Sequence, residues 1–223
     1  MGLEEIKLKS LGIDKTKFGR ITSFVDFGNV NYWYRFDKKD LDSKDLEPWQ
    51  KWVIGLEKLY NFLSLFSSQS RFYYGFNQRQ KKSWHIAFKA EKYGFIKITK
   101  PMQFIKHYLS QEEISRLEKP EMLNRDLQGS YIEIPKSNFD VEISVDSIRL
   151  LDKYDTICLL SGDSDFAALL KHLKRQGKKT IVISAGQVAH TLKEQADLYI
   201  QAQELKPVVG FIKTASRKFV KRK

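Results

Sequence analysis

The chain has 223 residues, of which 30% are charged, and its 39 Lys and Arg residues outnumber 27 Asp and Glu residues to give a formal net charge of +12. This length supports one substantial core and does not require two domains. The single cysteine, Cys158, excludes a disulfide framework and fits a reducing, cytoplasmic setting. Because no apolar run approaches the ~20 residues of a membrane helix, no membrane association is expected.

The first half of the chain predicts alternating strands and helices. We expect a polar lead-in over 1–19, a strand over 20–26 and a loop to about residue 45. Pro48 suits the first turn of a helix, and apolar residues at helical spacing extend that helix to Phe66. A strand over 71–76, a helix over 80–93 that ends at Gly94, and a strand over 95–99 follow.

The second half resumes this alternation after an interruption. Residues 101–136 form a mixed, charged segment that is treated as an insertion, with a short strand expected over 131–134. The later elements are expected to be a helix over 140–152, a strand over 156–160, a helix over 166–176, a strand over 180–184 and a helix over about 187–195. A basic tail is expected over 206–223. The fold class is therefore α/β, a three-layer Rossmann-like fold with a mainly parallel sheet of about five strands.

Carboxylates follow two of the predicted strands directly. Asp26 ends the first strand, and Asp163 and Asp165 follow the apolar strand over 156–160. In an open parallel sheet, ligands bind beyond the carboxyl ends of the strands, so these acids are expected to converge. Two carboxylates about 4 Å apart repel by roughly 4 kcal/mol at an effective dielectric of ~20, and a divalent cation relieves that repulsion.

The chemistry of such a site indicates its ion and its substrate. Mg²⁺ and Mn²⁺ prefer carboxylate and water oxygens, and Mg²⁺ is often completed by substrate phosphates. The positive net charge independently predicts a polyanionic partner, because Lys and Arg neutralise backbone phosphates. A nucleic acid, either RNA or DNA, is therefore the expected partner.

Each acid also has a purely structural explanation. Asp163 or Asp165 could cap the helix that begins at Phe166, and Asp140 could cap the helix over 140–152. Asp26 could form an Asx turn. Ser161 could orient ligands through its hydroxyl or serve as a capping residue.

Four motifs occur in one order along the chain: Asp26-Phe-Gly-Asn29, Lys136-Ser-Asn-Phe-Asp140-Val, Ser161-Gly-Asp-Ser-Asp-Phe166 and the strand that follows Gly177. This combination resembles the NYN domain of the PIN-like nuclease superfamily, and most closely its bacterial LabA-like branch, over about residues 20–203. The resemblance implies a PIN-like domain over 20–205 whose clustered acids bind Mg²⁺ or Mn²⁺ and hydrolyse RNA phosphodiester bonds.

The resemblance also assigns individual residues. It implies a catalytic role for Asp26, Asn29, Asp140, Asp163 and Asp165, and it makes the four aspartates of this set the metal ligands. Asp146 matches a recurrent acid farther along the same helix. Since six helical residues turn through about 600°, Asp146 does not share the face of Asp140 and is ranked as peripheral.

Aromatic and basic residues alternate beside Asp26. Tyr32, Trp33 and Arg35 lie in this loop and are candidates for stacking on unpaired bases and contacting phosphates, and Lys136 is a further RNA-binding candidate. Alternatively, Trp33 and Phe36 pack beneath the loop as a lid on the core. A homodimer is also compatible with the sequence.

Two other functions compete with a ribonuclease. The run Gly162-Asp-Ser-Asp165 is similar to the metal loop of haloacid-dehalogenase phosphatases, but that chemistry needs a second Asp two residues after the nucleophile, where this chain has Gly28. The other competitor is an RNA-binding adaptor that keeps the acids and has negligible turnover.

Overall fold

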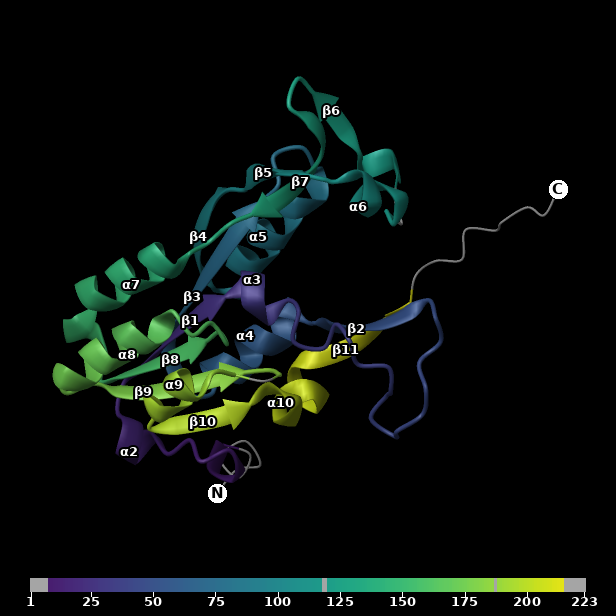
Figure 1. Ribbon diagram of the computed structural model, residues 1–223. Helices are drawn as coiled ribbons and strands as arrows, with labels where there is room; N and C mark the ends of the chain where they lie inside the picture. The colour runs from purple at the N-terminus through teal and green to yellow at the C-terminus, as the bar shows by residue number, and fades with distance from the viewer. Residues whose placement is uncertain (1–7, 118–119, 187, 215–223) are drawn as a thin grey trace.

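The computed structural model describes residues 8–117, 120–186 and 188–214, which form a central sheet with helices on both faces (Figure 1). The sheet has six strands in the order β10-β9-β8-β1-β3-β4, and all neighbouring strands pair in parallel. The strands are β1 (Ile21–Asp26), β3 (Ser67–Phe76), β4 (Ile96–Pro101), β8 (Thr156–Leu160), β9 (Lys179–Ser184) and β10 (Leu198–Gln201). The predicted α/β class and parallel sheet are confirmed, with β10 as a strand that the sequence reading did not include.

Apolar side chains alternate between the two faces of the sheet and build two cores. Phe24 of β1 packs with one group of helices, and its neighbour Val25 packs with the other. The first group is α7 (Asp140–Arg149), α8 (Phe166–Arg175) and α9 (His190–Glu194), and the second is α4 (Leu56–Ser64), α5 (Lys81–Tyr93) and α10 (Ala202–Val209). The molecule is therefore a three-layer structure, as expected.

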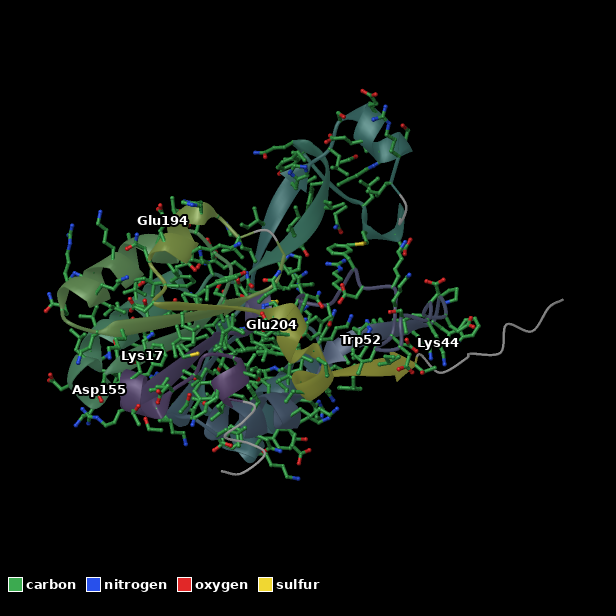
Figure 2. The ribbon with its side chains drawn as sticks, turned by 90° about the horizontal axis from the view of Figure 1, so that it is seen from below. Lys17, Lys44, Trp52, Asp155, Glu194 and Glu204 are labelled. Atoms are coloured by element: carbon green, nitrogen blue, oxygen red, sulfur yellow. The ribbon has the colours of Figure 1, made fainter. Side chains whose placement is uncertain are left out.

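The helix predicted from Pro48 begins later than expected. Residues 50–54 form β2 (Gln50–Ile54), which pairs antiparallel with β11 (Gly210–Thr214). Trp52, labelled in Figure 2, is buried in this strand. Its indole nitrogen donates a hydrogen bond to the backbone oxygen of Lys39 at 2.8 Å. The prediction was wrong here because the partner strand lies more than 150 residues away, where local spacing gives no signal.

The basic tail also begins later than predicted. Lys206 lies in α10, where its ammonium is 2.8 Å from a carboxylate oxygen of Asp37 and 4.7 Å from the ring centre of Trp52. Lys213 lies in β11. The expected boundary at residue 206 therefore falls inside a helix, and the folded unit continues through residue 214. The tail residues over 215–223 lie outside the described part of the chain.

The described part of the N-terminal lead-in, residues 8–19, contributes apolar side chains to the core although its composition is polar. Asp14 caps the short helix α2 (Lys15–Phe18) by accepting a hydrogen bond from the backbone nitrogen of Thr16. Leu8, Ile13 and Phe18 are buried against the core. The described part of the lead-in is therefore packed onto the domain.

The predicted insertion forms a small antiparallel sheet of its own. Its strands are β5 (Gln103–Tyr108), β6 (Asn124–Asp126) and β7 (Gly129–Lys136), in the order β5-β7-β6. The short helices α6 (Gln111–Ser115) and η1 (Pro120–Met122) connect β5 to β6. Figure 1 shows this unit extending from the end of β4 beyond the central sheet. The strand expected over 131–134 is thus part of the longer β7, which leads directly to α7.

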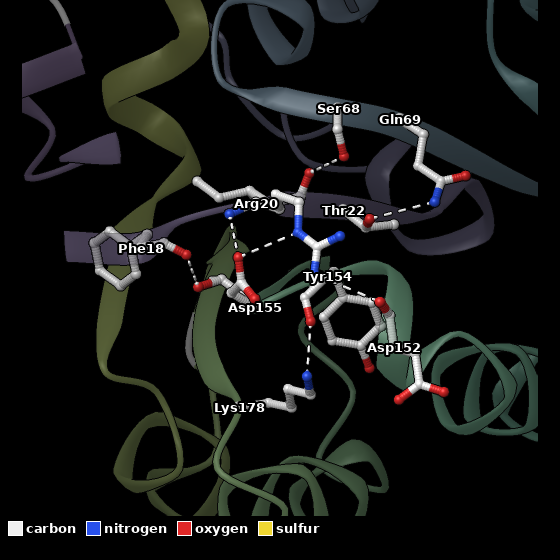
Figure 3. Close-up of polar contacts among 11 residues, drawn as sticks. Phe18, Arg20, Thr22, Ser68, Gln69, Asp152, Tyr154, Asp155 and Lys178 are labelled. Carbon is white, nitrogen blue, oxygen red and sulfur yellow. Dashed lines mark hydrogen bonds and ion pairs between the residues drawn. The ribbon is translucent and has the colours of Figure 1, made fainter. Parts of the chain in front are cut away.

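The N-terminal edge of the central sheet is held by polar contacts between its strands (Figure 3). Just before β8, Asp155 accepts hydrogen bonds from the backbone nitrogen of Arg20 at 2.8 Å and from its guanidinium at 3.4 Å. Lys178 donates to the backbone oxygen of Tyr154 at 2.8 Å. These contacts align the starts of β1, β8 and β9, so that their opposite ends meet at one edge.

None of the helices within the described ranges combines the length and the apolar character needed to cross a lipid bilayer.

Candidate functional site

The carboxyl end of β1 is tied to that of β8 by a pair of side chains. Asp26 accepts a hydrogen bond from the Ser161 hydroxyl at 3.0 Å, and a longer one from the backbone nitrogen of Asn29 at 3.4 Å. The Asn29 side-chain oxygen accepts from the backbone nitrogen of Gly162 at 3.2 Å. Asp26 is therefore the N-cap of the short helix α3 (Phe27–Val30), and it also faces the loop after β8.

The loop between β8 and α8 presents two acids. The backbone nitrogen of Asp163 donates to the Ser161 hydroxyl at 3.3 Å, and the Asp163 carboxylate accepts from the backbone nitrogen of Asp165 at 3.0 Å. Asp165 is the N-cap residue of α8, but within the described structure its side chain makes no capping hydrogen bond. The capping explanation for Asp165 is therefore not supported, whereas Asp163 has a local structural role in this turn.

A third segment brings Asp140 to the same place. Asp140 is the first residue of α7, and its backbone nitrogen donates to the side-chain oxygen of Asn138 at 2.8 Å. Asn138 thus performs the local capping that the sequence reading considered for Asp140. The Asp140 carboxylate is left to face the loop after β8.

Asp140, Asp163 and Asp165 each place one carboxylate oxygen within 4.8 Å of the other two. We call these three residues the acidic cluster. They come from α7 and from the β8–α8 loop, which are 23 residues or more apart in sequence. Asp26 is not one of the three, but it lies next to them through its hydrogen bond with Ser161.

The electrostatics of the site reflect this crowding. Burial raises the pKa of Asp26 to about 6, and the negative charges of Asp140 and Asp163 raise it as well, against the hydrogen bonds from Ser161 and Asn29. Burial also raises the pKa of Asp140, with Asp163 and Asp165 adding to the rise. Without a cation, these carboxylates therefore resist being ionised together.

The donor set fits a hard divalent cation. Every side chain of the acidic cluster offers carboxylate oxygen, the ligand that Mg²⁺ and Mn²⁺ prefer, and no cysteine lies in the loops that form it. Burial and then the charges of Asp163 and Asp165 raise the pKa of Asp140, and nearby Lys100 offsets this rise only in part. A bound divalent cation would supply further positive charge.

One basic residue at this edge was not anticipated from the sequence. The Lys100 ammonium, at the end of β4, lies 2.5 Å from a carboxylate oxygen of Glu142 and 4.6 Å from the ring centre of Phe139. Lys100 also lowers the pKa of Asp140, although its effect is smaller than the opposing ones. Its position as the penultimate residue of an edge strand is the signal that could have identified it.

Asp146 lies in a different environment from Asp140, although both belong to α7. It accepts hydrogen bonds from the Arg71 guanidinium at 2.7 Å and from the Tyr73 hydroxyl at 2.8 Å. These contacts attach α7 to β3. The peripheral ranking of Asp146 agrees with this geometry, because its charge is already paired.

The aromatic loop divides into exposed and buried residues. Tyr32 and Phe36 are 54% and 83% exposed, and the Arg35 guanidinium lies 5.1 Å from the ring centre of Tyr32. Trp33 is only 6% exposed and packs in the core. The prediction that Trp33 offers a surface for RNA bases is therefore corrected, because its ring is covered by the fold. The packing alternative describes Trp33 but not Phe36.

Comparison with known proteins gives similarities of three kinds. A family model described as the NYN domain matches residues 20–203. A stretch of 75 residues is 32% identical to the "Low amplitude and bright protein LabA" of Synechococcus elongatus, and it covers 33% of this chain and only 40% of LabA. The crystal structure of a protein of unknown function from Vibrio parahaemolyticus aligns with a TM-score of 0.52 and 19% identity, over 82% of this chain and 91% of that one.

These similarities agree with the order of the structural elements and with the acids at the strand ends. The likeness to the Vibrio protein supports the fold alone, because the identity is low. The family match includes β1, the insertion, the acidic cluster and β10. The chain is similar to LabA over part of its length, it has a PIN-like fold, and it belongs to the NYN domain family.

Proposed function

We propose that this protein is a metal-dependent ribonuclease that hydrolyses phosphodiester bonds of RNA. The observation that carries the proposal is the acidic cluster, where three carboxylates from two segments converge at the carboxyl edge of a parallel sheet. Such a concentration of negative charge costs stability unless a cation is bound, so a purely structural role explains it poorly.

The three acids of the cluster would hold Mg²⁺ or Mn²⁺, and Asp26 would complete the set from the end of β1. A bound divalent cation supplies a water of lowered pKa as the nucleophile and offsets negative charge on the phosphate. We assign the catalytic role to Asp26, Asn29 and the acidic cluster together.

The neighbouring residues position these acids. Ser161 holds one oxygen of Asp26 and also accepts from the backbone of Asp163, so a single hydroxyl fixes the two strand ends relative to each other. Asn29 fixes the same loop through Gly162 with a neutral amide, which adds no further negative charge. With both its oxygens hydrogen-bonded, Asp26 is placed to bind a cation rather than to attack a phosphate as a nucleophile.

The remaining surface suits a single-stranded substrate. Tyr32 is exposed beside the Arg35 guanidinium, which is an arrangement that can stack on bases and contact phosphate. The net charge of +12 attracts a polyanion to the molecule as a whole. The homodimer and the cytoplasmic location stay predictions from the sequence.

Cleavage of end-labelled single-stranded RNA in Mn²⁺, Mg²⁺ or EDTA tests the proposal. We expect the unmodified protein to cut in the presence of metal and Asp163→Asn to lose this activity, because one charged ligand is removed while the shape is kept. Asp152→Asn is the matched control, since Asp152 is an exposed acid in the short 3-10 turn η2 (Leu151–Lys153) that follows α7, outside the acidic cluster.

The outcomes separate the proposed nuclease from an adaptor. Cutting that requires metal and is lost only in Asp163→Asn supports a nuclease and rules out a contaminating enzyme, because all variants are purified identically. RNA binding without cutting by any variant would contradict the nuclease and favour the adaptor.

A further inference from the structure

A pocket of about 420 Å³ lies beside the acidic cluster, between the insertion and the start of α7. Its walls come from the ends of β4 and β7, the start of β5 and the first turn of α7, and include Lys100, Gln103, Ile105, Lys136, Asn138 and Val141. The volume lies within the range of about 300–1,000 Å³ that is typical of small-ligand sites. Asn138 belongs to both places, because it lines the pocket and caps the backbone nitrogen of Asp140.

The pocket carries positive charge on one side. Lys136 is exposed at the end of β7, and within the described ranges no carboxylate forms an ion pair with its ammonium. Lys100, by contrast, is paired with Glu142. Lys136 is therefore the side chain that can neutralise an incoming anion without first breaking an ion pair.

Two aliphatic side chains also line the pocket. Ile105 is 46% exposed and Val141 is 71% exposed, and both contribute to the lining. An anion-binding lysine together with two aliphatic side chains suits a ligand that is charged in one part and flat and apolar in another. A nucleotide unit has this character, with its phosphate and its base.

The close approach of two segments fixes the pocket next to the acids. A Cβ atom on Gly75 of β3 would lie 2.3 Å from the Cβ atom of Ser137, which is too short for two carbon atoms. Only glycine at this position lets the connection from β7 to α7 lie directly against the end of β3. Lys136 precedes this connection and Asp140 follows it. Packing against β3 therefore fixes the position of Lys136 relative to Asp140.

We propose that this pocket binds one nucleotide of the RNA strand, the unit adjacent to the phosphate that lies at the acidic cluster. Lys136 contacts the phosphate of this nucleotide, and Ile105 and Val141 pack against its base or ribose. Gln103 and Asn138 offer polar atoms at the rim. The identity of the neighbouring phosphate rests on the proposed ribonuclease function, whereas binding of the nucleotide does not require cleavage.

Binding of a fluorescent single-stranded RNA in EDTA, measured by anisotropy over a range of salt concentrations, tests the charged side of the pocket. We expect Lys136→Ala to weaken binding several-fold and to reduce the slope of log K against log salt by about 0.7, the value for one phosphate contact on a single strand. Lys153→Ala is the control, because Lys153 is an exposed lysine beyond the other end of α7. It should bind with the affinity and salt slope of the unmodified protein.

A second pair of variants tests the aliphatic residues that line the pocket. Val141→Gln should weaken RNA binding with little change in the salt slope, whereas Val145→Gln should not, because Val145 is exposed one turn farther along α7 and does not line the pocket. Circular dichroism and thermal unfolding confirm that all four variants are folded. Equal losses from both valine variants would overturn the pocket and point to the helix face as a docking surface.

Cleavage in Mn²⁺ by the same variants separates this inference from the nuclease. If the unmodified protein cuts RNA and Lys136→Ala binds and cuts equally well, the nucleotide pocket is wrong and the nuclease stands. If no protein cuts RNA but Lys136→Ala and Val141→Gln lose binding as described, the pocket stands and the nuclease is wrong. A protein that does not bind single-stranded RNA overturns the pocket.

Discussion

Just before β8, Asp155 lies against the guanidinium of Arg20, whereas just after the same strand Asp163 lies against other acids. At the first end, hydrogen bonds from the Arg20 backbone and guanidinium lower the pKa of Asp155. At the other end, burial and neighbouring negative charges raise the pKa values of Asp26 and Asp140. At the N-terminal edge of β1 and β8 the carboxylate is therefore paired with a cation, whereas at the carboxyl edge of the same two strands the carboxylates face one another.

This difference separates structural acids from functional ones. An acid with a cationic partner in the fold contributes to alignment and needs nothing from outside, as Asp155 and Asp146 do. Acids that face one another store unfavourable energy that an external cation can release. The following three substitutions test the contrast by changing one edge at a time.

The largest effect is expected on catalysis at the carboxyl edge. Asp140→Asn should reduce metal-dependent RNA cleavage by at least about 100-fold, because loss of even an outer-shell partner of a metal typically costs about 10–100-fold and Asp140 is a direct ligand candidate. Asp155→Asn should cleave RNA at a rate within about twofold of that of the unmodified protein, because it removes only an exposed ion pair at the other edge. Cleavage rates at saturating Mn²⁺ measure both. Similar losses in the two variants would mean that the edges do not differ in function.

The next effect is an increase in stability without metal. In EDTA, Asp26→Asn should raise the free energy of unfolding at pH 7 by about 2 kcal/mol, because the buried carboxylate has a pKa raised from 3.8 to about 6 and each unit corresponds to about 1.4 kcal/mol. We expect less than the full shift because the amide accepts a weaker hydrogen bond from Ser161 than the carboxylate does. Denaturant unfolding measures the difference.

The pH dependence of the free energy of unfolding gives a control for the stabilisation expected in Asp26→Asn. Between about pH 4 and pH 6 the native metal-free protein binds more protons at Asp26 than the unfolded chain, so its stability falls as pH rises through this window. Asp26→Asn should reduce that fall, and Mn²⁺ should stabilise the unmodified protein more than the variant. A variant that is less stable than the unmodified protein at pH 7 in EDTA would contradict the proposed cost of burying this carboxylate.

The smallest effect is expected at the N-terminal edge, with the opposite sign. Asp155→Asn should lower the free energy of unfolding at pH 7 by less than about 1 kcal/mol, because the pair with Arg20 is largely exposed and screened by solvent. Since the pKa of Asp155 is lowered, the contribution of this carboxylate is present at neutral pH and is lost below about pH 4. Unfolding curves of both proteins should therefore converge in acid, and a difference that persists there would contradict this account.

The central sheet could be predicted from local sequence because its strands are short, apolar and bounded by clear turns. The strands expected over 20–26 and 156–160 agree with β1 and β8, and the helix expected over 80–93 agrees with α5 and ends at Gly94 with a positive φ. The pairing of β2 with β11 could not be predicted in the same way. It joins residues that are more than 150 positions apart in the chain, and Trp52 of β2 also fits a helical pattern.

Asp26, Asp163 and Asp165 were identified because they follow strands directly, and Asp140 was identified through the family resemblance. Whether these acids converge depends on strand order. The positions of β1 and β8 and the orientation of α7 bring Asp140, Asp163 and Asp165 together. The same arrangement leaves Asp26 beside these three acids rather than among them. The burial of Trp33 likewise depends on packing, since Trp33 and the exposed Tyr32 are adjacent and both aromatic.

The sequence by itself determined the α/β class, the family resemblance and the residue types that can bind a divalent cation, because these depend on local patterns and on motif spacing. The tertiary structure alone decided which acids meet, which of them are neutralised by Arg20 or Arg71, and where the insertion forms a pocket beside Asp140. The physical reason is that charge interactions and pocket walls depend on distances between segments that are far apart in the chain.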